Sequence, residues 1–210
     1  QVGKGDAVIN ISERLFKLGE KVSLVSFPLY ALPIGMSIRK MLCSSQEEWE
    51  KIRGMGAVIG TKRQTEIAMA MFALNRLETL DYLVKVAQSG DILLFDRSSF
   101  SNALTLAYHV FLGNVKESEI EQEVGKALYF DNLFIKKLNL KNCILNLRTS
   151  NTPWKATRGE GEDKHERREV QDLCDITYNY YEKKAGDGWK RVITRRNGEW
   201  RSRESIRKDC

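Results

Sequence analysis

Apolar residues along the chain follow two alternating spacings. Short apolar runs of strand length are separated by longer stretches in which apolar residues recur at helical spacing. The predicted strands cover residues 21–27, 92–95, 143–147 and 189–194. The predicted helices cover residues 4–18, 34–42, 63–89, 101–111, 118–137 and 166–184. Strands that alternate with helices predict an α/β fold with a parallel sheet and helices on both of its faces.

The longest predicted helix, residues 63–89, carries a single apolar stripe and ends at Gly90. The stripe consists of Ile67, Ala70, Met71, Leu74, Leu77, Leu80 and Val84. One such stripe predicts a helix that buries one face against the rest of the protein. Two segments give no regular pattern: residues 46–60 predict at most one short charged helix and a loop, and residues 151–163 predict a loop.

Composition narrows the class of protein. With 210 residues, the chain fits one α/β domain better than two. No apolar run is long enough to cross a bilayer, and no signal peptide begins the sequence, so the cytoplasm is the expected location. The four cysteines are scattered, which predicts reduced thiols. The net charge of +6 suits a protein that handles polyanions, either nucleotide phosphates or nucleic acid.

The first residues form a candidate phosphate-binding turn. Gly3, Lys4, Gly5 and Asp6 directly precede or open the first predicted helix. Backbone N–H groups at a helix N-terminus attract anions, and a lysine there adds a mobile cation. The alternative is a flexible chain end. The strand that would precede such a turn is not in the sequence, which lacks an initial methionine, so we expect that strand upstream of residue 1.

The second strand, residues 92–95, runs directly into Asp96 and Arg97. Ligands of α/β sheets bind at the carboxyl ends of strands. An aspartate there can hold Mg²⁺ through water, and an arginine can bind a phosphate through two hydrogen bonds. The alternative is a surface ion pair at the end of a strand.

Two further segments are candidates for nucleotide contacts. Phe72 and Arg76 lie one turn apart on the longest predicted helix, so a base could stack on the ring while the guanidinium reaches its edge. The alternative is that Phe72 belongs to the core. In the segment 157–166, Arg158 and Lys164 are candidate cations of a lid that closes over phosphates. The alternative is an ordinary solvated loop.

In chain order these segments resemble the thymidylate kinases, a family of P-loop nucleoside monophosphate kinases. The resemblance covers about residues 1–170 and is carried by GKGD, SFP, LPIG followed by IRK, FALNR, DRSSFSNA and RGEGEDKHE. It implies a three-layer P-loop NTPase fold in one domain over residues 1–210, with a lid at about 151–166. It also implies a cytoplasmic homodimer that uses ATP and Mg²⁺ to convert dTMP to dTDP.

The resemblance also implies roles for individual residues. Catalysis would depend on Lys4, Arg97 and Arg158. ATP would bind to Gly3, Lys4, Gly5 and Asp6, and Asp96 would hold Mg²⁺ through water. The acceptor nucleotide would bind to Phe72, Arg76, Arg97, Ser101 and Asn102.

Several residues depart from the family pattern and leave alternatives open. Asp6 places a carboxylate beside the phosphates, Ser26 and Tyr30 stand where relatives have arginines, and Ser98 replaces a tyrosine. The chain could therefore be a kinase for another nucleotide, or a nucleotide-binding relative without catalysis. A fourth hypothesis is nucleic-acid binding through residues 189–210, which contain eight Lys or Arg, three Asp or Glu, and two tryptophans; the alternative is a solvated face and a frayed tail.

Overall fold

The structure is a computed structural model, and it describes residues 4–43, 61–138, 144–149, 168–185, 188–196 and 199–209. The predicted loop at 46–60, the predicted lid at 151–166 and the candidate residues Gly3 and Arg158 lie outside these ranges. None of the described helices is both long enough and apolar enough to cross a membrane.

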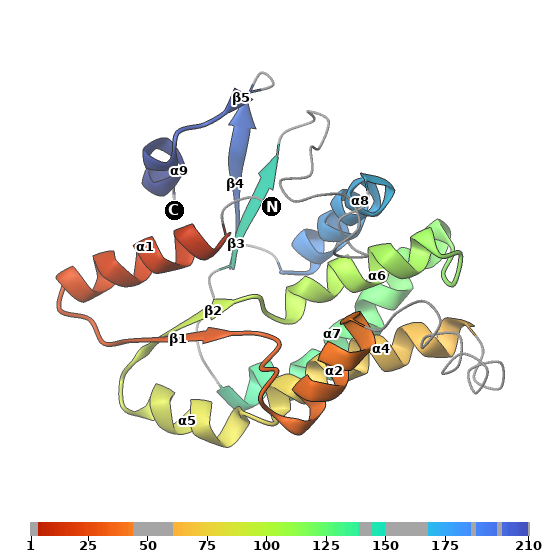
Figure 1. Cartoon of the computed structure of the whole chain (residues 1–210), viewed down its shortest axis with the longest axis horizontal. Coiled ribbons are helices and arrows are strands. Elements are labelled where there is room, and N and C mark those ends of the chain that lie inside the picture. Colours follow the sequence, from red (N-terminus) through yellow and green to blue (C-terminus); the bar gives the residue numbers. More distant parts are fainter. Residues whose placement is uncertain are drawn as a thin grey trace.

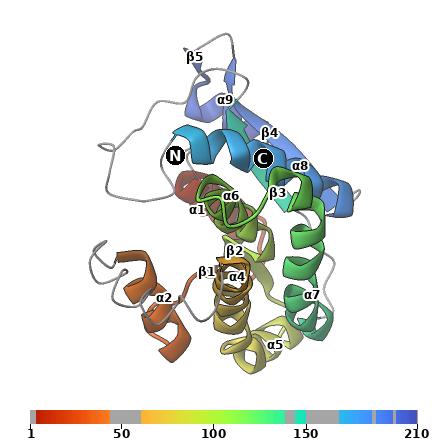
Figure 2. The same ribbon diagram turned by 90° about the vertical axis from the view of Figure 1, so that its right-hand side faces the viewer.

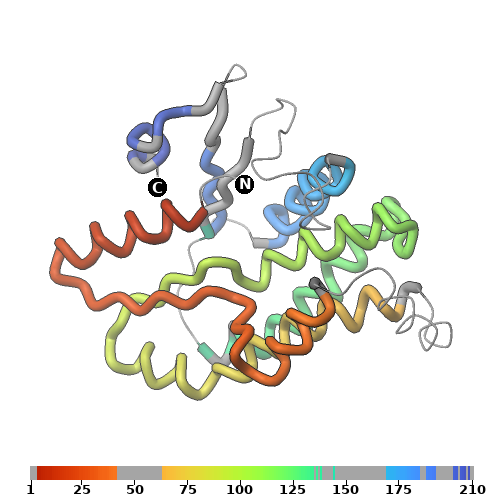
Figure 3. The backbone as a smooth tube through the Cα atoms, in the orientation of Figure 1, coloured from red at the N-terminus to blue at the C-terminus, as the bar shows by residue number. Residues whose placement is uncertain are grey.

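The first half of the chain follows the predicted order of elements (Figure 1). It forms α1 (Lys4–Lys17), β1 (Val22–Ser26), α2 (Pro33–Cys43), α4 (Thr61–Leu77), α5 (Leu80–Gln88) and β2 (Ile92–Asp96). The backbone turns back between α1 and β1 (Figure 3) at Gly19, whose φ of 84° is easily adopted by glycine.

The second half confirms five predicted elements and adds four short ones. It forms η1 (Ser99–Ser101), α6 (Asn102–Phe111), η2 (Glu117–Glu119), α7 (Ile120–Leu138), β3 (Ile144–Thr149), α8 (Arg168–Ala185), β4 (Trp189–Arg196), β5 (Glu199–Trp200) and α9 (Arg203–Asp209). The expectation of a frayed tail was wrong for the described residues, because β5 pairs with β4 and α9 follows it.

The described strands form two sheets. β1 pairs with β2 in parallel, and β3 pairs with β4 in parallel. The parallel orientation was predicted, but one sheet was expected where the described strands form two. β5 is antiparallel to β4, which the expectation of a purely parallel sheet did not include. Helices α1 and α5 lie on opposite sides of the β1–β2 pair (Figures 1 and 2), so this pair is covered on both faces.

Two apolar clusters hold the elements together. The larger one joins helices α4, α6, α7 and α8 and consists of Met69, Ala103, Leu106, Val110, Val115, Ile120, Val124, Ala127 and Tyr181. The second joins the β1–β2 pair to α5 and α7 through Phe27, Leu83 and Phe134. The rings of Phe27, Phe95 and Phe134 lie within 6.2 Å of one another, mostly edge to face. These contacts fix the strands relative to the helices.

The predicted single helix at 63–89 is two helices, α4 and α5. The Thr79 hydroxyl donates a hydrogen bond of 2.8 Å to the Arg76 carbonyl oxygen, and the Thr79 N–H bonds the same oxygen at 3.1 Å. Local bonds of this kind compete with the helical ladder and end α4. The predicted apolar stripe was also partly wrong, because Ile67 and Leu74 are exposed while Ala68, Met69 and Ala73 are buried.

Gly35 in α2 is expected to tolerate no larger residue. A Cβ atom at this position would lie 1.8 Å from the Leu29 carbonyl oxygen and 2.9 Å from the Tyr30 Cα. Both neighbours are backbone atoms, which cannot move away by a rotamer change. We expect Gly35→Ala to lower the free energy of unfolding by about 1–3 kcal/mol, as overpacking does, measured by urea denaturation.

The matched control is Gly125→Ala in α7. Nothing lies within 4 Å of a Cβ atom placed there, and the residue is in a helix. Alanine is favoured over glycine in helices, so this variant should gain about 0.5–1 kcal/mol. Equal stability of the two variants would show that the close contact at Gly35 is not a constraint.

The hydrogen bonds to Asp91, which precedes β2, lead us to expect that the stability of the fold depends on pH. Its carboxylate accepts hydrogen bonds from Ser23 Oγ (2.8 Å) and Ser89 Oγ (2.9 Å). These bonds, that of Ser23 first, lower the pKa of Asp91 below its ordinary value of 3.8. Since the folded pKa is the lower one, the stabilisation is complete above about pH 4 and is lost as the pH falls through the folded pKa.

We therefore expect Ser23→Ala to raise the pKa of Asp91 toward its ordinary value. The difference in melting temperature between Ser23→Ala and the unchanged protein should shrink as the pH is lowered from 6 to 2. The Asp91 pKa can be followed by NMR of its side-chain carboxyl carbon. A constant difference in melting temperature across this range would mean that the serine acts through packing and not through the charge.

Candidate functional site

The carboxyl ends of β1 and β2 lie side by side. Ser26 and Asp96 are partners in the register, and the Phe27 N–H donates to the Asp96 carbonyl oxygen at 3.0 Å. Ser26 Oγ lies 3.5 Å from Asp96 Oδ2. Both strands therefore end at one edge with a hydroxyl and a carboxylate, at the place where α/β proteins bind ligands.

Arg97 follows β2 in a left-handed backbone conformation. Its φ is 69°, and among the described residues it is the one non-glycine residue with a positive φ. This conformation costs a side-chain-bearing residue about 1–3 kcal/mol and is found most often at functional sites. The side chain of Arg97 is exposed, so a cation stands next to the Asp96 carboxylate at the strand end.

Helix α1 brings its N-terminus toward the same end of the strands. It runs antiparallel to β1 and β2 (Figures 1 and 3), and it begins at Lys4. Lys4, Gly5 and Asp6 are all exposed in its first turn. The positive end of the helix dipole and the Lys4 ammonium favour an anion at this point, while the Asp6 carboxylate opposes one.

The loop after Arg97 is anchored by aromatic packing. The Phe100 ring in η1 lies 6.0 Å from that of Tyr181 and 5.5 Å from that of Trp189, both edge to face. The Ser101 hydroxyl accepts a hydrogen bond of 3.2 Å from the Ser98 N–H. These contacts hold the segment between Arg97 and α6 in place. They also engage the half-buried Trp189 ring in packing within the fold, while the nucleic-acid hypothesis for residues 189–210 stays a prediction.

Arg76 forms a buried ion pair with Asp131 of α7. Its Nε donates to Asp131 Oδ1 at 3.0 Å, and its Nη2 contacts the same oxygen. Asn102 Nδ2 donates to the other oxygen, Oδ2, at 3.3 Å. The exposed fractions are 2% for Arg76 and 0% for Asp131. Two residues predicted to bind the acceptor therefore meet at one carboxylate that was not predicted.

Burial is the largest influence on the pKa values of Asp131 and of the neighbouring Tyr181. It raises the pKa of Asp131, against the opposing effect of the Arg76 charge and of hydrogen bonds from Arg76, Ser99 and Asn102. Burial also raises the pKa of Tyr181 well above 10.0, and the Asp131 charge adds to this rise. Burial therefore favours the neutral form of both groups, and for Asp131 the Arg76 charge and its hydrogen bond act in the opposite direction.

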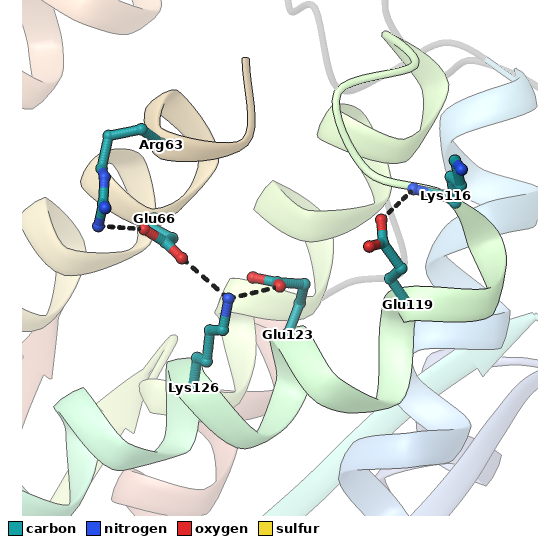
Figure 4. Close-up of polar contacts among 6 residues, drawn as sticks. All are labelled: Arg63, Glu66, Lys116, Glu119, Glu123 and Lys126. Atoms are coloured by element: carbon teal, nitrogen blue, oxygen red, sulfur yellow. Dashed lines mark hydrogen bonds and ion pairs between the residues drawn. The ribbon is translucent and has the colours of Figure 1, made fainter. Parts of the chain in front are cut away.

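A second ion-pair group joins the same two helices (Figure 4). Lys126 of α7 bonds Glu66 of α4 at 2.9 Å and Glu123 of its own helix at 2.8 Å. Arg63 bonds Glu66 as well, at 2.6 Å. The hydrogen bond that Lys126 donates to Glu123 is the main cause that raises the pKa of Lys126. Helices α4 and α7 are thus joined at two points, which holds Asp131 opposite Arg76.

Asn75, next to Arg76, connects α4 to the loop after β1. Its side chain accepts a bond of 2.8 Å from the Leu29 N–H and donates one of 3.3 Å to the Leu29 carbonyl oxygen. Glu78 accepts a hydrogen bond of 2.9 Å from the Ile34 N–H at the start of α2. The FALNR segment therefore positions the loop that carries Tyr30, a role that its motif alone did not predict.

The predicted site residues fall into two groups. Lys4, Gly5, Asp6, Asp96 and Arg97 lie at the strand-end side of the molecule, on α1 and directly after β2. Arg76 and Asn102 lie in the buried group around Asp131. Phe72 is half-buried on α4, and Ser101 is half-buried at the end of η1. The nucleotide-binding roles of all these residues stay predictions.

Asp131 and Tyr181 were missed by sequence reasoning. The signal for Asp131 was available: a single carboxylate stands in the apolar stretch ALYFDNLF, where a helix of this pattern buries its residues. Its partner could not be found, because Arg76 is distant in the sequence. Tyr181 gave no signal, since a tyrosine in an amphipathic helix is an ordinary core residue.

The described residues contain no cluster of three or more His, Cys, Asp or Glu side chains that could hold a metal ion. Asp96, with Ser26 beside it, offers one carboxylate and one hydroxyl at the strand ends. This set fits Mg²⁺, which keeps several waters and is bound through one or two carboxylates together with substrate phosphates.

Comparisons with known proteins give a match in structure and none in sequence. No protein-family description matches the chain, and no curated protein is similar to it in sequence. Among solved structures, the thymidylate kinase from Candida albicans, described as having broad substrate specificity and a novel structural element, superposes with a TM-score of 0.64. The match covers 93% of this chain and 80% of that one at 17% identity. The chain therefore has a mostly helical α/β fold with a small parallel sheet, like that of a thymidylate kinase.

Proposed function

We propose that this protein is a nucleotide kinase, which transfers the γ-phosphoryl group of ATP to a nucleoside monophosphate, with dTMP as the expected acceptor. The observation that carries the proposal is Arg97, a cation in a left-handed conformation directly after the Asp96 carboxylate. The likeness in fold to a thymidylate kinase supports it. In this proposal residues 1–210 form one P-loop domain of three layers, with the lid at 151–166.

Phosphoryl transfer requires alignment and charge neutralisation more than covalent help from the protein. The N–H groups of Gly3, Gly5 and Asp6 would bind the ATP phosphates, and the Lys4 ammonium would contact the β- and γ-phosphates. Arg97 would bridge the donor and acceptor phosphates, joined by Arg158 of the lid. Each of these groups would neutralise charge that the transferring phosphoryl group spreads over its oxygens.

Asp96 would hold Mg²⁺ through a water molecule, with Ser26 beside it to fix the carboxylate. Mg²⁺ bound there supplies positive charge between the β- and γ-phosphate oxygens. On the acceptor side, Phe72 would stack on the base, Arg76 would bond its edge, and Ser101 and Asn102 would line the same site.

The direct test is ADP release by the full-length protein with ATP, Mg²⁺ and one acceptor at a time: dTMP, dUMP, dCMP, dAMP or UMP. Turnover with dTMP above all others would support the proposal. Turnover with another acceptor would keep the reaction and change the substrate. The panel is broad because the similar Candida albicans enzyme is described as broadly specific.

A second candidate function is nucleotide binding without catalysis. Two observations favour it: the Asp6 carboxylate lies in the first turn of α1, and Arg76 is engaged by Asp131. In that case ATP should raise the melting temperature, while no acceptor supports ADP release. Measurable dTDP formation by the purified protein would rule it out.

We further propose a homodimer formed through α2 and α4. These two helices pack together and leave apolar side chains exposed, namely Met36, Ile67 and Leu74. Sedimentation velocity should show a dimer, and Leu74→Glu should give a monomer, since a buried unpaired charge opposes association. A monomer for the unchanged protein at micromolar concentration would contradict the proposal.

A further inference from the structure

Two of the side chains predicted to bind the acceptor nucleotide, Arg76 and Asn102, both donate to the carboxylate of Asp131. Arg76 donates to Oδ1, through Nε at 3.0 Å, and Asn102 donates to Oδ2 at 3.3 Å. A nucleotide base would offer carbonyl oxygens to the same donors. Asp131 therefore accepts the hydrogen bonds that a base would need.

Because the ion pair is buried, Arg76 cannot bond Asp131 and a nucleotide base at the same time. Arg76 is 2% exposed, Asn102 1% and Asp131 0%. A base cannot contact the Arg76 guanidinium in this conformation, because the surrounding protein covers it. Binding through Arg76 requires its side chain to leave the carboxylate.

We propose that Asp131 is a positioning residue that competes with the acceptor base for Arg76. The acceptor nucleotide binds by exchanging the Arg76–Asp131 ion pair for a hydrogen bond between Arg76 and a base carbonyl oxygen. Affinity then depends on how strongly Asp131 retains the arginine, so Asp131 favours acceptors whose base offers a strong carbonyl acceptor. The inference rests on the proposed nucleotide kinase function.

The exchange requires a new donor for Asp131, and Tyr181 supplies it. The Tyr181 hydroxyl is fully buried, and within the part of the chain that the structure describes it has no hydrogen-bond partner. Tyr181 packs in the same apolar cluster as Ala103, which follows Asn102, and Ala127, which lies one turn before Asp131, so it lies near the pair. An unpaired buried hydroxyl is costly, and it becomes satisfied when Asp131 loses Arg76 and turns to the phenol.

The first test compares Asp131→Asn with the unchanged protein by calorimetric titration with dTMP in the absence of ATP. The amide keeps the shape of Asp131 but removes its charge, so Arg76 is held less tightly. We expect the Kd for dTMP to fall by about tenfold, within the usual range of coupling between two interacting sites. The Nε–Hε resonance of Arg76 should shift on dTMP addition.

The second test uses Tyr181→Phe, which removes the proposed reserve donor. Its melting temperature without ligand should stay the same or rise, since an unpaired buried hydroxyl is lost. Its Kd for dTMP should rise by about fivefold. The matched control is Tyr129→Phe on the exposed face of α7, which should change neither value.

The outcomes separate this inference from the proposed function. Lack of ADP release by the unchanged protein would oppose the kinase, whereas the inference is decided by the Kd of the variants. A Kd for Asp131→Asn equal to or above that of the unchanged protein would overturn it, as would an unchanged Kd for Tyr181→Phe. If Asp131→Asn binds dTMP and the unchanged protein does not, competition between Asp131 and the base for Arg76 is supported, even where the unchanged protein releases no ADP. If neither the unchanged protein nor Asp131→Asn binds dTMP, the inference is wrong.

Discussion

Replacement of Arg76 by methionine is expected to lower the free energy of unfolding by about 3–5 kcal/mol. The reason is the carboxylate that remains: Asp131 is fully buried in α7 and keeps only uncharged hydrogen-bond donors, namely Asn102 and Ser99 and the Tyr181 hydroxyl proposed above. A buried charge without its counter-ion retains the whole cost of desolvation. Urea denaturation of the purified variant measures the loss.

The double variant Arg76→Met with Asp131→Leu provides the control. Buried ion pairs replaced by apolar side chains of similar size are often neutral or stabilising, because neither charge must be desolvated. We expect the double variant to recover most of the stability lost in Arg76→Met. If it is as unstable as the single variant, the charge is not the cause, and the guanidinium stabilises the fold through its packing.

Replacement of Arg97 by glycine is expected to change activity and stability in opposite directions. The charge that would bridge the two phosphates is lost, so kcat should fall by about 10²–10³-fold, as after removal of one positioned donor from an active site. Glycine adopts a φ of 69° without steric cost, so the melting temperature should stay the same or rise. Steady-state ADP release and thermal denaturation measure the two effects.

Arg97→Ala is the matched control, because it removes the same charge but keeps a Cβ atom in the left-handed conformation. It should lose as much activity as Arg97→Gly and gain no stability. Activity retained by both variants would show that Arg97 is not part of the reaction. A melting temperature that falls by the same amount in both variants would mean that the Arg97 side chain stabilises the loop.

The sequence alone determined most elements and part of the candidate site. The predicted strands at 21–27 and 92–95 correspond to β1 and β2. A short apolar run bounded by glycine or charged residues can form few local structures other than a strand. The Asp96–Arg97 pair was placed correctly at a strand end, since it directly follows such a run. These predictions depend only on residues that are close together in the sequence, so a single sequence was enough to make them.

The tertiary structure decided what depends on distant residues. The break at Thr79, the pairing of β5 with β4, and above all the contact between Arg76 and Asp131 could not be inferred. From its motif, Arg76 was expected to face a nucleotide. Whether a side chain on α4 faces a ligand or a buried carboxylate on α7 is set by how the two helices pack, because the pairing of charges in the interior follows distance in space and not separation along the chain.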